Sequence, residues 1–311
     1  MINNFITKTS SGLYCSKGDF YIDPRKAVHK ALVSHAHSDH AVPTKGNVYC
    51  TLPTQSFMLH RHKQKSQPVY NNVKYGIPFL LNDVEITFYP AGHILGSAQI
   101  LMKSENERYL YTGDFKTQQD DSCETFEFIE CDHLITETTF ASPEYNHPDP
   151  LEQIHSLVKE NRNVIIGAYA LGKAQRLTQL ITKNCSNVNV YIHPELEVYH
   201  NLYADHGISL GNWQSYRRND FEKDQSGVYI VPPSYLKRFS ADDNVIRVFA
   251  TGWKRSFYRC DKVLQVSDHA DWNGILEMIT RTKAKKVYTV HGNGNFLKEY
   301  LKDKIEVNII G

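Results

Sequence analysis

The chain has 311 residues, of which 41% are hydrophobic and 12% aromatic, and its formal net charge is +1. This composition excludes a disordered chain and gives no global attraction to a polyanion, so any surface for phosphate groups must be local. The 6 cysteines show no CxxC pairing, the N-terminus lacks a secretory signal, and no stretch approaches the roughly 20 apolar residues that span a bilayer. We therefore expect a globular cytoplasmic protein with reduced thiols and no membrane contact.

Short strands separated by turns fill the chain from residue 20 to about residue 140. Apolar and polar residues alternate in them, as in residues 84–89, which is typical of strands with one buried face. Together they predict an open, mostly antiparallel sheet. The expected strands are Lys30–Val33, Val84–Tyr89, Ala98–Met102, Arg108–Tyr111 and His133–Thr136.

Near residue 148 the pattern changes to alternating helices and strands. Residues 148–150 read Pro-Asp-Pro, an N-cap followed by a helix-starting proline. A strand at Asn163–Ala168, a helix through Ala174–Ile181 and a strand at Val188–Ile192 follow. This order favours a small βαβ lobe with parallel pairing.

The rest of the chain returns to strands around one helix, after a stretch, 210–227, that has no clear period. The simplest division is a first domain of residues 1–145 and 261–311, interrupted by an insert of residues 146–260. The expected later elements are strands at Val228–Val231, Val245–Phe249, Val263–Val266 and Lys286–Val290, and a helix at Trp272–Arg281.

The strongest local signal is a run of four potential metal ligands directly after the apolar residues 31–33. These are His35, His37, Asp39 and His40. In an extended segment the first three project to one side, and a turn after them brings His40 to a neighbouring point. The alternative is a set of surface histidines in a polar loop.

One segment cannot complete two metal sites, because zinc prefers four ligands and a catalytic ion keeps a position for water. His93, Asp114 and His291 each follow an expected strand and lie next to glycine. Taken alone, each is more often a loop residue than a ligand. Their shared position at strand ends favours a joint metal site.

These seven residues resemble the full ligand series of the metallo-β-lactamase superfamily. The resemblance implies an α/β fold, an αββα sandwich, whose core carries an inserted small α/β cap. It further implies one ion on His35, His37 and His93, a second on Asp39, His40 and His291, and Asp114 as the bridge. Imidazole and carboxylate ligands suit zinc and do not exclude manganese.

Two further motifs resemble the β-CASP nucleases of this superfamily. Glu137 ends a strand in LITETT, and His269 lies in SDHAD. The turn at residues 168–176 resembles the cap-domain turn of that branch, although Gly172 could simply open a helix. The motifs at 13–24, 91–99, 231–234 and 267–272 are most similar to the bacterial ligase-associated DNA damage response exonuclease family, also labelled an mRNA 3′-end processing factor.

The resemblance implies hydrolysis of phosphodiester bonds in nucleic acid. Two neighbouring divalent ions would activate water for attack on phosphorus and neutralise charge on the phosphoryl oxygens. Asp39 would bind metal and orient the nucleophile. His269 would donate to a phosphate oxygen or protonate the leaving 3′-oxygen, with Glu137 fixing its tautomer. The family name implies DNA repair beside a DNA ligase and a helicase.

Local basic residues are the candidates for binding a single-stranded or end-containing nucleic acid, and DNA is favoured over RNA as that partner. The clusters are Arg61, Lys63 and Lys65, then Lys173 and Arg176, then Lys254, Arg255 and Arg259. We expect them to line a cleft between core and insert, with aromatics such as Trp253, Phe257 and Tyr258 among them. The alternative is solvated surface charge.

Three other functions fit part of the pattern. An RNA-processing nuclease of the same fold would use the same ligands. A small-molecule hydrolase would share the seven ligands but has no need of Glu137, His269 and a cap. A catalytically silent nucleic-acid-binding subunit would ordinarily have lost ligands.

Overall fold

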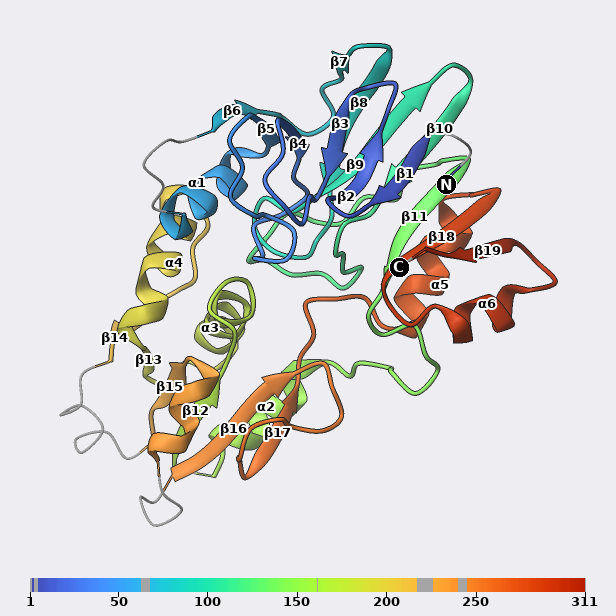
Figure 1. Ribbon diagram of the computed structural model, residues 1–311. Coiled ribbons are helices and arrows are strands. Elements are labelled where there is room, and N and C mark those ends of the chain that lie inside the picture. Colours follow the sequence, from blue (N-terminus) through green and yellow to red (C-terminus); the bar gives the residue numbers. More distant parts are fainter. Residues whose placement is uncertain are drawn as a thin grey trace. The chain divides into compact units, whose positions relative to one another are not determined.

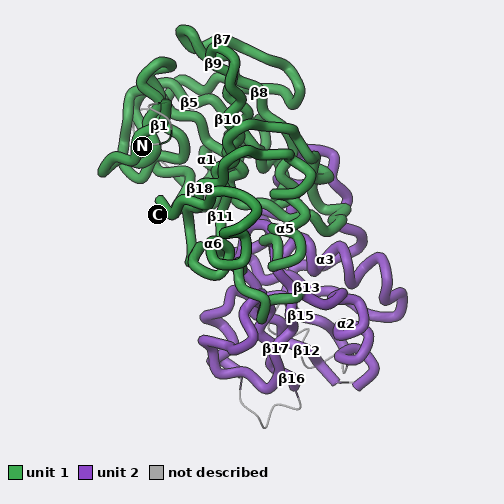
Figure 2. The backbone as a smooth tube through the Cα atoms, turned by 90° about the vertical axis from the view of Figure 1, so that its right-hand side faces the viewer, with its two compact units in different colours: residues 1–146, 269–311 green, residues 147–268 purple. Residues whose placement is uncertain are grey.

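The computed structural model describes residues 2, 5–62, 68–160, 162–216, 226–239 and 245–310 (Figure 1). The chain forms two compact units, one of residues 1–146 with 269–311 and one of residues 147–268 (Figure 2). The second unit ends later than the residue 260 expected for the insert. The reason is that β17 (Lys262–Gln265) pairs in parallel with β16 (Val245–Thr251) and so belongs to the sheet of the second unit.

The first sheet of the first unit has the order β1-β2-β3-β4-β5-β6. It is antiparallel from β1 to β3 and parallel from β3 to β6, which differs from the mostly antiparallel sheet expected. Parallel neighbours need a crossover, and α1 (Leu52–Arg61) provides one between β5 and β6. The strands are β1 (Ile6–Thr9), β2 (Gly12–Cys15), β3 (Phe20–Ile22), β4 (Lys30–Leu32), β5 (Asn47–Cys50) and β6 (Val69–Asn72).

The second sheet has the order β19-β18-β11-β10-β9-β8-β7. Strands β10, β11 and β18 are parallel to one another, and β9 is antiparallel to both β8 and β10. Consequently β8, β10, β11 and β18 all end at the same edge of this sheet. The strands are β7 (Phe79–Leu81), β8 (Val84–Pro90), β9 (Ala98–Ser104), β10 (Glu107–Tyr111), β11 (His133–Thr138), β18 (Lys286–Gly292) and β19 (Glu306–Ile309).

The two sheets enclose the main core of the first unit. Buried Phe20 from the first sheet and Phe88 from the second belong to one apolar cluster. On the outer face of the first sheet, Met58 of α1 packs with Val48. On the outer face of the second, α5 (Trp272–Arg281) and α6 (Asn295–Leu301) bury residues such as Ile275. The layers are therefore helix, sheet, sheet and helix, as the resemblance implied.

The second unit is built on one parallel sheet of order β14-β13-β15-β12-β16-β17. One face packs on α2 and α3, and the predicted βαβ lobe with parallel pairing is confirmed. The elements not yet given are α2 (Pro150–Val158), β12 (Asn163–Gly167), α3 (Lys173–Asn184), β13 (Val190–Ile192), α4 (Pro194–Asp205), β14 (Gln214–Ser215), β15 (Val228–Val231) and the 3-10 helix η2 (Pro233–Arg238). Residues 217–225 of the unassigned stretch lie outside the described part of the chain.

The 6 cysteines are all free thiols. Four of them are buried, and burial raises the pKa of Cys50 and of Cys131 to about 12. The expectation of reduced thiols agrees with this arrangement. Within the described residues, no helix is long and apolar enough to cross a membrane.

Helix α4 buries a histidine against α3. The ring of His200 is 1% exposed, and its Nε2 lies 2.9 Å from Oγ1 of Thr178. The other ring nitrogen, Nδ1, lies 3.0 Å from the carbonyl of Leu196 and donates its proton to it. In the neutral ring Nε2 is therefore an acceptor for the Thr178 hydroxyl, which also lies 2.8 Å from the carbonyl of Ala174. The ring is therefore held as a neutral imidazole.

This neutral ring predicts a loss of stability in mild acid. Burial lowers the pKa of His200 to about 4, while an unfolded histidine has a pKa of about 6.5. As pH falls from about 6.5 to about 4, His200 is protonated in the unfolded chain but stays neutral in the folded chain, so the free energy of unfolding decreases. Between pH 7 and pH 5, His200 alone should lower the free energy of unfolding by about 2 kcal/mol.

Urea unfolding of the parent and of His200→Gln at pH 7 and pH 5 measures this contribution. Glutamine offers an amide to the same neighbours and does not titrate. We expect the decrease in unfolding free energy between the two pH values to be smaller in the variant by that amount. An equal decrease in both proteins would contradict the assignment.

Candidate metal centre

Strand ends from both sheets of the first unit supply the candidate ligands. The segment after β4 carries His35, His37, Asp39 and His40, and the other residues follow strands of the second sheet that end at one edge. His93 follows β8, Asp114 follows β10, and His291 lies at the end of β18. Gly113, with φ +56, lets the chain turn directly before Asp114, where a Cβ would meet Ser34 at 2.8 Å.

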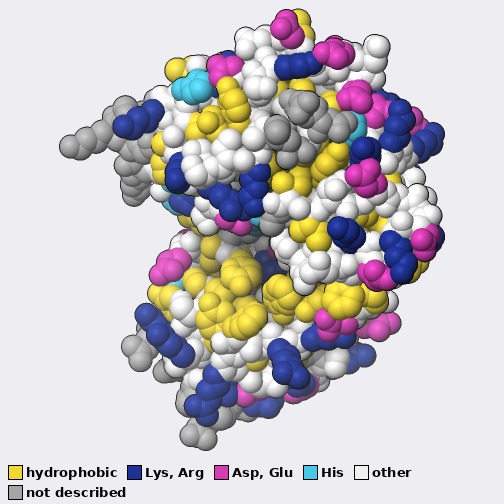
Figure 3. Space-filling model, turned by 45° about the vertical axis from the view of Figure 1, so that its right-hand side comes forward, with side chains coloured by type: hydrophobic (Ala, Val, Ile, Leu, Met, Phe, Trp, Pro, Cys, Tyr) yellow, Lys and Arg dark blue, Asp and Glu magenta, His cyan; other side chains and the backbone are white. Residues whose placement is uncertain are grey.

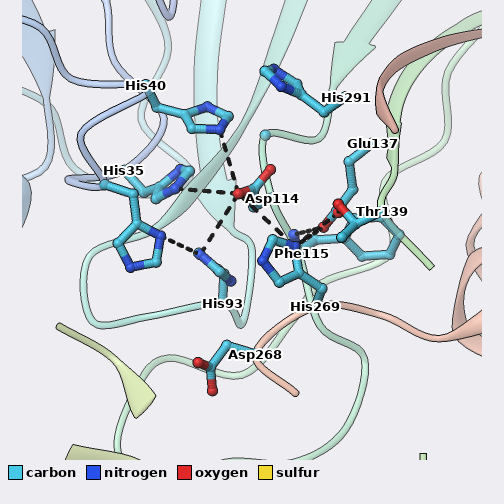
Figure 4. A network of polar contacts seen from close by, with 12 residues as sticks. His35, His40, His93, Asp114, Phe115, Glu137, Thr139, Asp268, His269 and His291 are labelled. Atoms are coloured by element: carbon cyan, nitrogen blue, oxygen red, sulfur yellow. Dashed lines mark hydrogen bonds and ion pairs between the residues drawn. The ribbon is translucent and has the colours of Figure 1, made fainter. Parts of the chain in front are cut away.

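The first group consists of His35, His37, His93 and Asp114, whose ligand atoms all lie within 4.8 Å of one another. His35 Nε2 lies 3.5 Å from the Asp114 carboxylate, and His93 Nε2 lies 3.9 Å from it. The nearest pair of nitrogens is His93 Nε2 and His37 Nδ1, 2.9 Å apart. Figure 4 shows the imidazoles of His35 and His93 turned toward the carboxylate of Asp114. The three histidines predicted for the first ion and the predicted bridge are thus side by side.

The second group is looser. His40 Nε2 lies 3.4 Å from Asp114 and 3.6 Å from Asp39, and the rings of His40 and His291 have centroids 4.7 Å apart. The side chain of Asp39 is 70% exposed. Among the described residues, neither Asp39 nor His291 joins a set of three mutually close ligand atoms. The structure therefore brings His40 and Asp114 together and places Asp39 and His291 at their margin.

Two buried nitrogens test whether these residues fit a metal ion. Ser34 Oγ donates to Asp23, so His35 Nδ1 donates to Ser34, and His40 Nδ1 donates to Asp23 at 2.7 Å. Both histidines then present Nε2 toward Asp114, and neither Nε2 has a hydrogen-bond partner within the described residues. A nitrogen lone pair that faces a buried carboxylate is unfavourable unless a proton or a metal cation lies between them. The donor set of imidazole and carboxylate fits zinc or manganese.

The charges of the group agree with a cation site. Burial raises the pKa of Asp114, but His40, His269 and His35 outweigh it and hold that pKa well below its usual range. Burial lowers the pKa of His40, but Asp114 and Asp23 raise it well above its ordinary value. For His35, burial and the neighbouring His40 lower the pKa far below its ordinary value, so the ring stays neutral. Asp114 is thus a charged acceptor, and a proton on His40 supplies positive charge where an ion would.

Asp23 is a functional candidate that the sequence did not single out. Its buried carboxylate accepts four hydrogen bonds, from Ser34 N at 2.7 Å, Ser34 Oγ at 2.5 Å, His40 Nδ1 at 2.7 Å and Tyr111 OH at 2.9 Å. It fixes the ring of His40 directly and that of His35 through Ser34. Two signals in the sequence could have pointed to it: Asp23 lies within the motif at residues 13–24, and it directly follows a strand, β3.

Replacing Asp23 by asparagine should weaken metal binding without removing a ligand. The amide cannot accept on both sides, so the tautomers of His40 and His35 are no longer fixed. Changes of this kind cost roughly 10- to 100-fold in metal affinity. Zinc titration against a competing chelator measures it, with Asp83→Asn, an exposed carboxylate in the β7–β8 turn, as control. Equal affinities of the two variants would contradict this role.

A second constellation, of Glu137 and His269, adjoins Asp114. Glu137 is 1% exposed, and its carboxylate accepts from Phe115 N at 2.9 Å and Thr139 Oγ1 at 2.5 Å. His269 Nδ1 lies 2.8 Å from Glu137 Oε2 and 3.9 Å from Asp114. Because Nδ1–H donates to Glu137, the tautomer leaves Nε2 for another group. These contacts are drawn in Figure 4.

Two residues expected to bind nucleic acid have other partners. Lys173 is 4% exposed and Arg176 is 3% exposed. Lys173 Nζ lies 2.9 Å from Asp268 and donates to the carbonyl of Val266, and Arg176 donates to the carbonyl of Ser267. The expectation of solvent-facing phosphate contacts is therefore corrected: both side chains anchor the segment 266–268 within the second unit.

The remaining basic residues divide by exposure. Arg61 donates to the carbonyls of Ala36 and Ala41, which holds the ligand loop, while Lys63 and Lys65 lie outside the described residues. Lys254, Arg255 and Arg259 are exposed on the loop between β16 and β17. Of the predicted substrate contacts within the described residues, these three keep the exposure that such a role needs.

Comparison with known proteins places this fold and site. Residues 258–310 match a family described as Zn-dependent metallo-hydrolase RNA specificity domain. The chain is 30% identical to a probable DNA ligase of Opitutus terrae over 96% of this chain and 30% of that protein. It is 24% identical to Integrator complex subunit 11 of Danio rerio over 88% of this chain and 61% of that protein. An RNase J-like protein of Methanocaldococcus jannaschii is 31% identical over 50% of this chain and 44% of its own length.

A solved structure from Enterococcus faecalis, of a protein of unknown function, superposes with a TM-score of 0.61 at 16% identity and covers 91% of this chain and 79% of its own. The chain spans less than two thirds of the length of the relatives above. The fold and the family match define a metallo-hydrolase with the metallo-β-lactamase type of α/β fold. Within that class, the match of residues 258–310 and the similarity to these relatives indicate the metallo-β-lactamase/β-CASP nuclease family.

Proposed function

We propose that the chain hydrolyses phosphodiester bonds of nucleic acid with two divalent metal ions, zinc in the first place and manganese as the second choice. The observation that carries this proposal is the position of Asp114 between His35 and His40, whose buried Nε2 atoms both face it. A dyad of Glu137 and His269 beside that carboxylate supports it, since metal binding alone has no need of it.

In this proposal His35, His37 and His93 would hold one ion and Asp39, His40 and His291 would hold the other, and Asp114 lies close to both groups of residues. Bound ions of this kind act as Lewis acids and make water nucleophilic near neutral pH. Asp39, whose exposed carboxylate lies 3.6 Å from His40 Nε2, would bind metal and orient the attacking oxygen.

His269 supplies the proton transfers of the reaction. Glu137 holds its Nδ1–H, so Nε2 faces the reacting phosphate and either donates to a phosphoryl oxygen or protonates the departing 3′-oxygen. Glu137 itself is fixed by Phe115 N and Thr139 Oγ1, which makes it a positioning residue rather than a group that meets substrate. The product would carry a 5′-phosphate.

The proposed substrate is DNA, the proposed process is DNA repair, and the proposed mode of cleavage is exonucleolytic. The support is the similarity to the probable DNA ligase of Opitutus terrae, in which the matching segment makes up 30% of the length of that protein. A segment of this kind inside a protein named for joining DNA suggests that the two activities work together, and a DNA ligase and a helicase are the proposed partners. The residues of the second unit would form the substrate-binding cap.

The proposal includes a cytoplasmic location. Six free cysteines, two with thiol pKa values raised to about 12 by burial, suit a reducing compartment.

RNA processing is the second candidate, and a specific observation favours it. Residues 258–310, which contain His269 and His291, match the domain described as conferring RNA specificity. The names Integrator complex subunit 11 and RNase J-like protein point the same way for those proteins. A silent binding subunit and a small-molecule hydrolase have less support, because the ligand set and the Glu137–His269 dyad are both present.

The test uses single-stranded DNA and RNA of one sequence, labelled at either end, with zinc or manganese. Faster cleavage of DNA, with mononucleotides as the first products, is the expected result. Faster cleavage of RNA would favour the RNA-processing function. Cuts at internal positions would show an endonuclease and not an exonuclease. Absence of cleavage of both strands by the metal-loaded protein would overturn the nuclease proposal.

A further inference from the structure

An exposed group of aromatic side chains lies on the second unit and includes three rings that the sequence placed among the basic residues. Phe257 is 77% exposed, Tyr169 50%, Tyr258 38% and Trp253 37%. Single apolar residues on a surface are common, but four large aromatic rings from two neighbouring segments are not explained by folding. We call these four residues the aromatic surface.

The fold brings the two segments together. Strands β12 and β16 are parallel neighbours, with Gly167 opposite Phe249, so the chain leaves both at the same edge of the sheet. Tyr169 follows β12, and residues 252–260 follow β16. The ring of buried Phe249 lies between them, with centroids 6.3 Å from Tyr169 and 4.9 Å from Tyr258.

The loop that carries three of the rings is held by its own hydrogen bonds. His147 Nε2 donates to the carbonyl of Gly252 at 2.9 Å, and the amide of Trp253 donates to Thr251 Oγ1 at 3.2 Å. Ser256 Oγ accepts from the amide of Tyr258 at 2.9 Å and donates to its carbonyl at 2.6 Å. A loop ordered in this way loses little conformational entropy when a ligand binds.

The same loop carries a concentrated positive charge. Lys254, Arg255 and Arg259 are exposed, and none forms an ion pair with a carboxylate in the described part of the chain. Residues 251–260 contain no acidic residue, and the next one, Asp261, is bound by Arg247 at 2.6 Å. The whole chain has a net charge of only +1, so this is a local excess. On the face drawn in Figure 3, hydrophobic side chains gather in the lower half with Lys and Arg beside them.

Aromatic rings next to unpaired cations match one ligand chemistry in particular. Unpaired nucleobases stack on aromatic side chains regardless of sequence, and the phosphates between them attract lysine and arginine. A duplex keeps its base faces covered, so it cannot use the rings. A protein interface also uses aromatic residues and arginine, but three cations within residues 251–260, with no acidic residue among them, favour a ligand that carries phosphates.

We propose that the aromatic surface stacks unpaired bases of single-stranded nucleic acid, while Lys254, Arg255 and Arg259 contact the phosphates between them. This rests on the proposed function and adds that the substrate enters with unpaired bases. Single strands of DNA and of RNA share this chemistry, and the experiment separates them.

Fluorescence anisotropy of the full chain in a chelator measures binding without cleavage. The probes are a labelled thymidine 20-mer, a uridine 20-mer and a duplex of the same length. Phe257→Ala and Trp253→Ala should each weaken binding of at least one single strand by roughly fivefold to 100-fold. Phe257→Tyr keeps the ring and should bind like the parent. The matched control is Phe296→Ala, which removes a ring 55% exposed on α6 of the first unit.

The cations are tested by the salt dependence of the same binding. Each of Lys254→Ala, Arg255→Ala and Arg259→Ala should reduce the slope of log affinity against log salt by about 0.7. Changes below twofold for both aromatic variants, with slopes unaltered, would overturn the proposal and leave the surface to a protein partner. An equal loss of duplex binding in the aromatic variants would contradict stacking.

A failure of this inference can be told from a failure of the proposed function. Hydrolysis of bis(4-nitrophenyl) phosphate by the metal-loaded parent has no base to stack and reports on the metal centre alone. If the parent does not hydrolyse it and cleaves no nucleic acid, the proposed function fails, whatever the anisotropy shows. If the parent hydrolyses it and Phe257→Ala and Trp253→Ala bind strands normally, only the aromatic surface fails.

Discussion

Asp114→Asn is expected to lose nuclease activity and bound metal together. Asparagine has nearly the same shape but no charge, so it cannot balance the surrounding imidazoles of His35, His40 and His93 or share two ions. Loss of a residue that only hydrogen-bonds to a metal ligand costs roughly 10- to 100-fold in metal affinity or activity. Loss of Asp114 itself should therefore exceed roughly 100-fold. Initial rates on labelled single strands and metal analysis of the same samples measure both effects.

The control is Asp303→Asn, which neutralises an exposed carboxylate of the same unit. It should keep the rate and the metal content of the parent. Circular dichroism of both variants confirms that equal folded concentrations are compared. Activity of Asp114→Asn within a few-fold of the parent would show that the carboxylate does not lie between the ions.

His269→Ala should lower the rate while leaving the metal in place. General acid catalysis by a positioned histidine contributes roughly 100- to 10,000-fold. Glu137→Gln should lower the rate by less, because His269 remains, and should displace its pH profile, since the amide no longer holds Nδ1–H as a carboxylate does. Unchanged metal content separates both variants from Asp114→Asn.

The leaving group decides between the two roles of His269. If it protonates the departing 3′-oxygen, the loss in His269→Ala should nearly vanish with a 4-nitrophenyl ester, whose leaving group needs no proton. If it donates to a phosphoryl oxygen, the loss should be similar for both substrates. Added imidazole should restore part of the rate. His29→Ala, which removes an exposed ring paired with Asp19, is the control. A His269→Ala protein as active as this control would contradict both roles.

Much of the ligand set was visible in the sequence because it recurs in one kind of place. Strands such as Val84–Tyr89 and Arg108–Tyr111 are marked by apolar residues, and a histidine or aspartate beside glycine follows each. Strand direction then brings these ends to one edge, as the pairings of β8, β10, β11 and β18 show. The helix at Trp272–Arg281 was also predicted, and in the structure the Asp271 side chain caps it by accepting from the amide of Gly274.

Other features depend on tertiary contacts that no local pattern reports. Asp23 resembles any carboxylate after a strand until the fold surrounds it with Ser34, His40 and Tyr111. Helix α4 was not predicted, although His193 accepts from the amide of Glu195 and Pro194 starts the helix, because its apolar residues form no clear stripe.

The roles of the basic residues likewise depend on tertiary contacts that the local sequence does not report. Lys173 and Arg176 lie in one turn of a helix, and their spacing is equally compatible with a phosphate-binding face and with buried ion pairs. Asp268, ninety residues later in the chain, decides between these. The boundary of the second unit followed the same logic, since only the pairing of β17 with β16 shows that Lys262–Gln265 belongs to it.

The most direct test of the central claim is the metal content of the purified chain after loading with zinc and removal of excess ion. Because His35, His40 and Asp114 are arranged for cations on both sides of one carboxylate, about two equivalents per chain are expected. A folded chain that retains no zinc and no manganese at neutral pH would contradict the account.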